Sequence, residues 1–276
     1  MKKMLKIVCI GAAMAVLAIG VSANGAGSLL SRYEFEGSWN NSGTSTWAVT
    51  PYGGAALGVA GVDPGANRSY KGSGLLNDAN IQSSTSWLQV GYDTTLDAVN
   101  GGISTQMTIA SWVKYTSTST SLQRIMGRGY SWYMDANTDG GAHQQYAQLI
   151  VRDSAFPTVV IGLQGDTSIG DGLWHHVAGT WDTATGAMNL YVDGLLDATK
   201  NTGVATSIQQ DSRYAIGARA SAATTGTSIY RGRVDDVRVY NVAMSQDQIQ
   251  TEVMPEPTTI ALLSLGSTLI FRRRRT

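Results

Sequence analysis

Beyond its first apolar segment this chain has no cysteine, since the single cysteine is Cys9. A disulfide, a thiolate zinc site and a cysteine nucleophile are therefore excluded from the main part of the chain. Residues 24–253 also hold only three lysines, and their 13 basic and 19 acidic residues give a net charge of −6. Because phosphate binding needs clustered Lys and Arg, this balance argues against DNA or RNA as a partner.

The first 23 residues have the pattern of a secretory signal peptide. Basic residues at positions 2, 3 and 6 precede an apolar run over residues 7–21, which small residues follow. We expect cleavage after Ala23. A retained membrane anchor is the weaker interpretation, because a run of this length barely spans a bilayer. The pattern predicts that the protein is exported.

Residues 254–276 form a second segment of distinct composition. It opens with MPEPTT, continues with apolar residues from 260 to 271 and ends in an arginine cluster at 272–275. A short apolar stretch before basic residues is typical of membrane retention with a cytoplasmic C-terminus. The three-part pattern resembles the bacterial PEP-CTERM sorting signal. That resemblance implies processing by an exosortase-type membrane protease, transient membrane association, and delivery to the cell surface or extracellular matrix.

The intervening residues 28–252 are predicted to form one all-β domain. Short runs rich in Val, Ile, Thr, Tyr and Trp alternate with Gly, Ser, Asn and Asp, a spacing that favours an antiparallel sandwich. Asp193 and Gly194 lie between two such runs and predict a hairpin. SQDQ at residues 245–248 is a capping box, which predicts a short helix over residues 245–252. The expected strands span residues 29–35, 87–90, 107–115, 146–152, 158–163, 173–181, 187–192, 214–217 and 232–240.

Five motifs follow one another in this domain: YEFEG at 33–37, IASWV at 109–113, DGLWHHVA at 171–178, LYVDG at 190–194 and GRVDDVRVYN at 232–241. In this order they resemble the LamG-like jelly-roll domains of the concanavalin A-like lectin/glucanase superfamily. The resemblance covers nearly all of residues 28–252. It implies two antiparallel sheets, one of them curved, whose concave face often binds glycans or proteins.

Aromatic and polar residues gather between positions 130 and 139. Exposed aromatic rings stack on sugars, and neighbouring Asp and Asn side chains bond the hydroxyl groups. The alternative is that Trp132 belongs to another core strand. The candidate ligand-binding residues are Tyr130, Trp132, Tyr133, Asp135 and Asn137.

A structural calcium ion that ties the first strand to the last is implied by related jelly rolls. Asp235 is expected on the inward face with Val237, by strand alternation, and needs a partner there. Glu36 and Asp235 are the candidate ligands, because calcium prefers carboxylate oxygens. The alternative is an ion pair between the aspartate and Arg32, Arg233 or Arg238.

Few residue patterns in the sequence indicate catalysis. Adjacent residues of a strand point to opposite faces, so His175 and His176 are not expected to share one site. Glu34 and Glu36 project from one side of the first strand at a spacing compatible with a glycosidase pair. However, the Glu-x-Asp-x-Glu motif of the superfamily's glucanases is absent from the chain. We therefore expect a protein that is not an enzyme.

The leading expectation is an exported surface or matrix protein that binds a glycan or extracellular polysaccharide. It is motivated by the fold resemblance, the sorting signal and the aromatic patch. The alternative is a structural or adhesive module that binds other proteins through a sheet edge. A relative of a glycoside hydrolase or lyase is the third possibility.

Overall fold

The computed structural model describes residues 27–35, 38–44, 49–52, 55–57, 75–77, 87–91, 103, 105–115, 122–129, 131–138, 145–152, 160–203, 213–220 and 226–253. The predicted terminal segments, residues 1–23 and 254–276, lie outside these ranges. Neither helical segment within the ranges has the length and apolarity that a membrane span requires.

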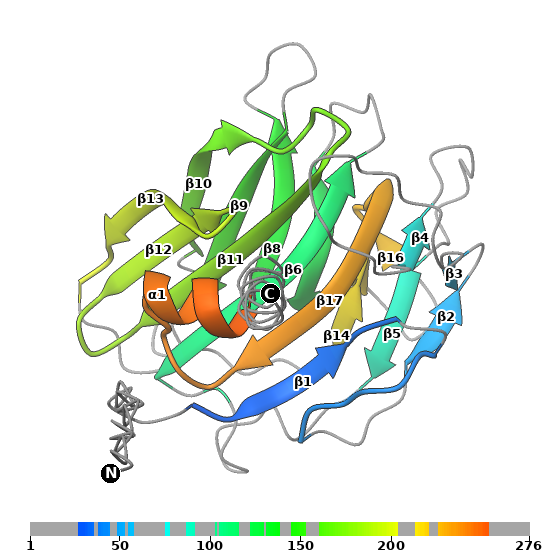
Figure 1. Ribbon diagram of the computed structural model, residues 1–276, viewed down its shortest axis with the longest axis horizontal. Helices are drawn as coiled ribbons and strands as arrows, with labels where there is room; N and C mark the ends of the chain where they lie inside the picture. Colours follow the sequence, from blue (N-terminus) through cyan, green and yellow to red (C-terminus); the bar gives the residue numbers. More distant parts are fainter. Residues whose placement is uncertain are drawn as a thin grey trace, which may run out of the picture.

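The described chain is built almost entirely of strands (Figure 1). Their bounds are β1 Leu29–Tyr33, β2 Thr50–Tyr52, β3 Ala56–Leu57, β4 Leu75–Asn77, β5 Trp87–Gly91, β6 Gln106–Tyr115, β7 Gln123–Arg128, β8 Trp132–Thr138, β9 Gln145–Arg152, β10 Val160–Ser168, β11 Trp174–Asp182, β12 Ala187–Val192, β13 Leu195–Asn201, β14 Tyr214–Ile216, β15 Arg219–Ala220, β16 Gly226–Thr227 and β17 Gly232–Tyr240. A short helix α1, Gln246–Gln248, continues into the π-helical turn Ile249–Val253.

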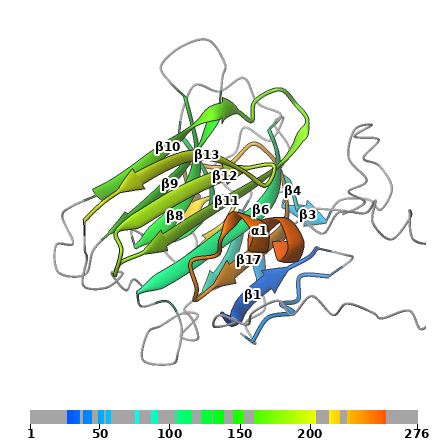
Figure 2. The ribbon, with the colours of Figure 1, turned by 60° about the vertical axis from the view of Figure 1, so that its left-hand side comes forward.

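The strands of the described chain form two large antiparallel sheets. One has eight strands in the order β13-β12-β11-β6-β17-β4-β3, with β1 also paired to β17; the other has seven in the order β10-β9-β8-β7-β14-β5-β2. β15 and β16 form a separate pair. The expected all-β, two-sheet architecture is confirmed. Figure 2 shows β10 and β13, one edge strand of each sheet, side by side.

The core lies between the two sheets, as strand alternation predicts. Ile109 and Val177 of the eight-stranded sheet and Leu149 of the seven-stranded sheet belong to one buried cluster. Gly179 in β11 allows the sheets to approach, because a Cβ there would lie 2.9 Å from two methyl carbons of Leu149. Each fully buried side chain of this kind contributes about 1.5–3 kcal/mol to folding.

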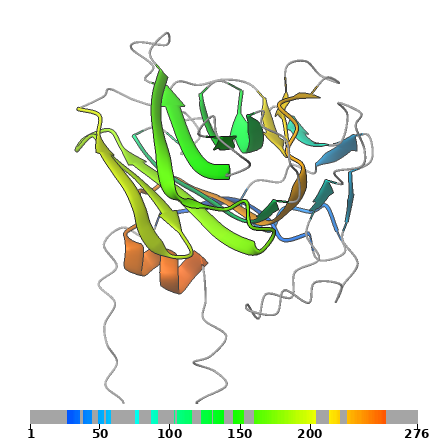
Figure 3. The same cartoon turned by 90° about the horizontal axis from the view of Figure 1, so that it is seen from above.

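The outward face of the eight-stranded sheet is partly covered by α1 and the turn after it (Figure 3). Met244 and Ile249 pack there against Ala110, Ala178 and Tyr240. The predicted capping box is present, with Ser245 accepting from the backbone N–H of Gln248. The predicted hairpin is also present. Asp193 and Gly194 both adopt positive φ, of 55° and 77°, as its turn requires.

A β-bulge in β17 departs from the expected alternation. Asp235 pairs with Trp112 of β6, but the next paired residue on β17 is Arg238, opposite Ala110. Asp236 lies inside the bulge with a φ of 45°. The extra residue shifts the alternation, so Val237 joins the core while Asp235 shares the outward side of Trp112. The prediction that Asp235 faces inward with Val237 is therefore wrong.

Candidate functional site

The predicted aromatic patch coincides with β8, whose alternation divides it between two faces. Trp132 belongs to the main core cluster and is 1% exposed. Its ring centroid lies 5.5 Å from that of Tyr214 on β14. The structure thus supports the core-strand interpretation of Trp132, whose ring is no exposed platform. Tyr133 and Asp135 lie on the opposite, outward face of the seven-stranded sheet, because Trp132, Met134 and Ala136 fill the core face.

Tyr133 and Asp135 are both held by Arg124 of β7. The guanidinium carbon of Arg124 lies 3.5 Å from the centroid of the Tyr133 ring. Its Nε donates to Asp135 Oδ1 at 2.9 Å, and its Nη1 donates to the carbonyl oxygen of Gly129. Gly127, the cross-strand neighbour of Tyr133, leaves room for the tyrosine, because a Cβ there would collide with it. Tyr133 therefore supports Arg124 rather than offering an open ring.

Burial dominates the ionisation of this cluster. Burial raises the pKa of Asp135, and the positive charge of Arg124 offsets only part of that rise. Burial likewise raises the pKa of the Tyr133 hydroxyl, against the opposing charges of Arg124 and Arg152. Both residues thus lie in a poorly hydrated environment that favours their neutral forms.

A row of polar side chains continues from this cluster across the sheet. Arg124 pairs with Asp135, Asp135 with Gln148 of β9, and Gln148 with Gln164 of β10. Four adjacent strands place the ends of this row roughly 14 Å apart. The amide nitrogen of Gln148 lies over Gly162, where a Cβ would be 3.6 Å away. The row places two partly exposed amide side chains beside a buried guanidinium and carboxylate.

The partly exposed members of this surface come from β9 and β10. On β9, Tyr146, Gln148 and Arg152 alternate with the buried residues Ala147, Leu149 and Val151. The sequence-based interpretation assigned a strand to residues 146–152 but missed these outward side chains. The period-two alternation of the strand was the signal that could have found them. Of the other predicted ligands, Tyr130 and the side chain of Asn137 lie outside the described residues.

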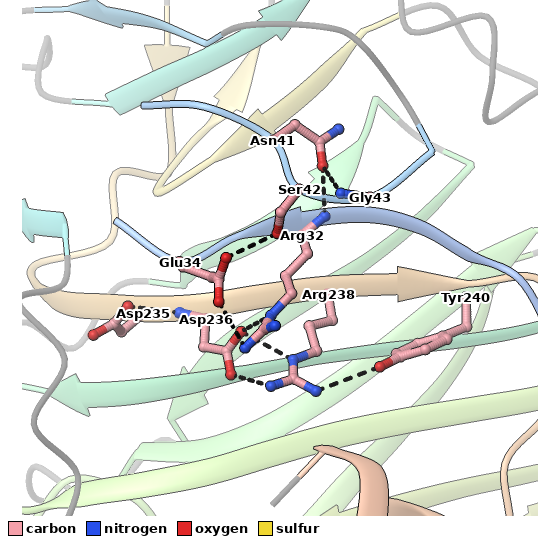
Figure 4. A network of polar contacts seen from close by, with 9 residues as sticks. All are labelled: Arg32, Glu34, Asn41, Ser42, Gly43, Asp235, Asp236, Arg238 and Tyr240. Carbon is pink, nitrogen blue, oxygen red and sulfur yellow. Dashed lines mark hydrogen bonds and ion pairs between the residues drawn. The ribbon is translucent and has the colours of Figure 1, made fainter. Parts of the chain in front are cut away.

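The first and last strands are joined by a second polar network (Figure 4). Arg32 of β1 and Arg238 of β17 are cross-strand neighbours, a placement that is unfavourable for two like charges. Asp236 relieves it, because its Oδ1 accepts from Arg32 Nε at 2.8 Å and from Arg238 Nε at 2.9 Å. The bulge aims Asp236 at both arginines, so this residue forms ion pairs with Arg32 and Arg238.

Two guanidiniums reverse the effect of burial on Asp236. Burial alone would raise the pKa of this carboxyl, but Arg238 and Arg32 hold it below its ordinary value. The pKa of Arg238 is raised in turn, since the favourable contacts with Asp236 and Tyr240 outweigh the cost of burial. This network stabilises the junction of the first and last strands.

Several carboxylate oxygens at this junction accept from protein donors. Asp235 Oδ1 accepts from the backbone N–H of Asp236 at 2.7 Å, and Glu34 pairs with Arg32 and Ser42. The described residues contain no group of three or more His, Cys, Asp or Glu side chains arranged for a metal ion. Glu36 lies outside them. The calcium site with Glu36 and Asp235 stays a prediction.

The two adjacent histidines point to opposite faces, as predicted. His175 bridges two carboxylates: Nδ1 lies 2.9 Å from Asp193 Oδ2, and Nε2 lies 2.9 Å from Asp171 Oδ1. His176 packs edge-on against Trp112, with ring centroids 5.4 Å apart. His175 thereby fastens the loop before β11 to the β12–β13 turn, which is a structural role.

A comparison with known families identifies the superfamily of this chain. A family model described as the concanavalin A-like lectin/glucanases superfamily matches residues 91–250, more than half of the chain. The chain belongs to this superfamily. No curated protein matches the chain.

Solved structures share the fold of this superfamily member at low identity. Domain 4 of AbnA, a GH43 extracellular arabinanase from Geobacillus stearothermophilus, was solved in complex with arabinotriose; it has a TM-score of 0.55 and 16% identity, over 82% of this chain and 98% of that domain. The ligand binding domain of botulinum neurotoxin serotype D, in complex with N-acetylneuraminic acid, has a TM-score of 0.56 and 13% identity, over 81% of this chain and 50% of that one. At these identities the likeness shows the fold alone.

Proposed function

We propose that this superfamily member is a non-catalytic glycan-binding protein that uses the outward face of β8, β9 and β10. The observation that carries the proposal is the surface of partly exposed Tyr146, Gln148 and Gln164, which lies beside the Arg124–Asp135 pair. An aromatic ring and amides on one surface are groups that stack on sugars and bond their hydroxyls. The complexes of the arabinanase domain with arabinotriose and of the neurotoxin domain with N-acetylneuraminic acid agree with this use of the fold.

The binding mode follows from the exposure of each group. Tyr146 offers the partly exposed ring, while Gln148 and Gln164 on adjacent strands offer amides that donate and accept. Arg124 and Asp135 are too deeply buried to contact much of a ligand and instead hold the surface in place. A binding face of few exposed groups favours weak binding that several sugar units share.

The test compares two amide substitutions on opposite sheets. Full chains carrying Gln148→Ala or Asn189→Ala are screened on a glycan array and titrated with extracellular polysaccharide. Asn189 is partly exposed on β12 and points outward, since Met188 and Leu190 lie in the core. We expect Gln148→Ala to weaken binding about three- to tenfold, the loss of one or two hydrogen bonds. Asn189→Ala should bind like the wild type. A wild type that binds no glycan would refute the function, and equal loss in both variants would refute the site.

The competing function is an adhesive module that binds another protein. It is favoured by the exposed leucines at the β12–β13 turn, Leu195 and Leu196, which are 62% and 49% exposed. A defined partner whose binding is lost in Leu196→Ser, kept in Gln148→Ala and not competed by sugar would replace the glycan proposal.

We further propose that the protein is exported, cut after Ala23 and processed near its C-terminus by an exosortase-type protease. Support comes from the three-part composition of residues 254–276. Intact-mass measurement of the protein recovered from its native cell surface tests both cuts. A full-length mass would contradict them.

Thermal unfolding with and without EDTA tests whether calcium binds, because a cation that binds the native state raises Tm.

A further inference from the structure

Three of the five exposed large apolar side chains of the described chain gather at one end of the sandwich. Leu195 and Leu196 open β13 and are 62% and 49% exposed, and Leu173, which precedes β11, is 45% exposed. The ring of His175 joins the loop of Leu173 to the β12–β13 turn, because it contacts one carboxylate from each. Apolar side chains that lie together on a surface mark an interaction site, and we call these three leucines the leucine rim.

The C-terminal end of the domain packs against this rim. The side-chain Oε1 of Gln246 in α1 accepts from the backbone N–H of Leu196 at 3.2 Å. The Nε2 of Gln250 donates to the carbonyl oxygen of Gly194, in the turn itself, at 2.8 Å. Val253 is the last described residue and follows Gln250 by three positions in the same helical turn. The chain therefore leaves the domain close to the leucine rim.

The sequence beyond residue 253 is apolar and then basic. Residues 254–259 lead to the apolar run at 260–271, which the arginine cluster at 272–275 follows. The linking residues reach about 25 Å at most when fully extended, so a lipid surface that accepts the apolar run lies near the rim. The run has 12 residues, fewer than the roughly 20 of a membrane-spanning helix, which favours a position at the lipid surface.

Lipid is a better partner for the rim than the apolar run itself. Three leucines cannot cover a run of 12 residues, whereas the edge of a hydrocarbon layer accepts both. The carboxylates of Asp171, Asp193 and Asp247 lie on the same loop, turn and helix as the contacts described above. The contact must therefore be apolar, rather than an attraction of basic groups to anionic headgroups. Each leucine gains by leaving water, as a side chain does on joining a core.

We propose that the leucine rim docks on the surface of a lipid bilayer, beside the point where the apolar run at 260–271 enters it. The inference goes beyond the proposed glycan binding and does not depend on it. The helix α1 lies on the outward face of the eight-stranded sheet (Figure 3), so docking on this side turns the glycan surface of the other sheet away from the bilayer.

The experiment measures how the full chain partitions onto vesicles of phosphatidylcholine, with and without phosphatidylglycerol. The test variant carries Leu195→Ser and Leu196→Ser together. The matched control is Val160→Ser, because Val160 is 48% exposed at the start of β10 in the other sheet. A second readout attaches an environment-sensitive fluorophore at Leu196→Cys or at Val160→Cys, in a Cys9→Ser background that leaves no other cysteine. Thermal unfolding shows whether each variant is folded.

The inference predicts about tenfold weaker partitioning of the double variant onto both kinds of vesicle, and wild-type partitioning of Val160→Ser. Bromine on the lipid chains should quench the fluorophore at position 196 and not the one at position 160. Equal partitioning of the double variant and the wild type, or no partitioning of the wild type, would overturn the inference. A loss confined to vesicles with phosphatidylglycerol would also overturn it, by assigning the binding to charge.

The other occupants of the rim give distinct results. A fluorophore at position 196 that is already buried without vesicles would overturn the inference. A second copy of the chain then covers the rim if the signal depends on protein concentration, and the apolar run covers it if the signal does not. A soluble protein that binds the rim while vesicles do not would favour the adhesive alternative. A glycan array without binding leaves the outcome of this experiment unchanged.

Discussion

Two buried carboxyl groups, one on each large sheet, show how the number of counter-ions decides the direction in which the pKa of a buried acid shifts. Asp236 in the β17 bulge contacts the guanidiniums of Arg32 and Arg238, and its pKa is lowered despite burial. Asp135 on β8 is completely buried, pairs with Arg124, and has a raised pKa because burial outweighs that pair. Two guanidiniums offset the loss of hydration, and one does not. The first arrangement holds an ionised acid between two strands, whereas the second surrounds an acid whose neutral form is favoured.

Loss of the charge on Asp236 should have the largest effect on stability. Asp236→Asn leaves Arg238 buried and Arg32 opposite it without the carboxylate between them. Removal of one partner from a buried ion pair costs about 3–5 kcal/mol, and we expect a loss of that size in urea unfolding. The control is Asp166→Asn at an exposed position on β10, which should stay within about 0.5 kcal/mol of the wild type. A loss under about 1 kcal/mol for Asp236→Asn would contradict the structural role of the network.

The same substitution at Asp135 should cost less, although Asp135 is the more buried residue. Its raised pKa means that the folded protein already favours the neutral acid, which an asparagine side chain resembles in charge and shape. We expect Asp135→Asn to lose about 1–3 kcal/mol, as for a buried hydrogen bond left unmade. Urea unfolding of both variants under one condition checks the order. A larger loss for Asp135→Asn would show that the count of counter-ions does not rank these acids.

The two acids should also change stability with pH in opposite directions. The lowered pKa of Asp236 means that its contribution is present above the unfolded value of about 3.9 and is lost as pH falls through the folded pKa. The raised pKa of Asp135 means that its contribution is present below about 3.9 and is lost as pH rises through the folded pKa. Urea unfolding between about pH 3 and pH 6 should therefore show a shallower acid loss for Asp236→Asn. The acid loss should be steeper for Asp135→Asn than for the wild type, and an unchanged slope in both variants would contradict these assignments.

Local patterns predicted much of the fold, because many of the interactions that decide it join residues that are close together in the sequence. The Asp193–Gly194 hairpin and the Ser245 capping box need only a few neighbouring residues, and both are present. Eight of the nine predicted strands lie within two residues of an observed strand's bounds, whereas others, including β7 and β8, were not predicted. Alternation failed in β17, where the bulge at Asp236 depends on Arg32, which is 204 residues away in the sequence.

The candidate site was predicted less well for a related reason. Strand alternation distinguishes two faces, but it does not say which face meets the other sheet. No strand was predicted over Trp132, which was weighed as an exposed ring because polar residues surround it in the sequence; it packs on Tyr214. Arg124 went unnoticed because no single-strand pattern predicts a cross-strand partner for Asp135. The side chains of a sheet surface come from strands joined by long connections, so their grouping becomes visible only once the register is known.

His175 is the basic counterpart of Asp236, because it lies between two carboxylates as Asp236 lies between two guanidiniums. Burial lowers the pKa of His175, but the hydrogen bonds and charges of Asp193 and Asp171 outweigh it and leave the pKa raised. The contribution of this group to stability is therefore complete below the unfolded pKa of about 6.5 and is lost as pH rises through the folded pKa. We expect the wild type to lose stability as pH rises above about 6.5, by less than in either aspartate experiment, because the Asp171 side chain is 45% exposed to solvent.

Proton NMR titration of the His175 ring tests this directly. The wild-type pKa should lie above about 6.5, and Asp171→Asn should lower it by removing one of the two carboxylates. Asp166→Asn serves again as the control, since its side chain is exposed on β10. In Asp171→Asn, His175 keeps Asp193 as its single counter-ion, as Asp135 has Arg124. If two counter-ions are needed to overcome burial, the pKa of His175 should fall in this variant and the neutral imidazole should be more populated. A His175 pKa that stays raised in Asp171→Asn would show that one close counter-ion is enough to overcome burial. The opposite pKa shifts of Asp135 and Asp236 would then have to be caused by their different depths of burial.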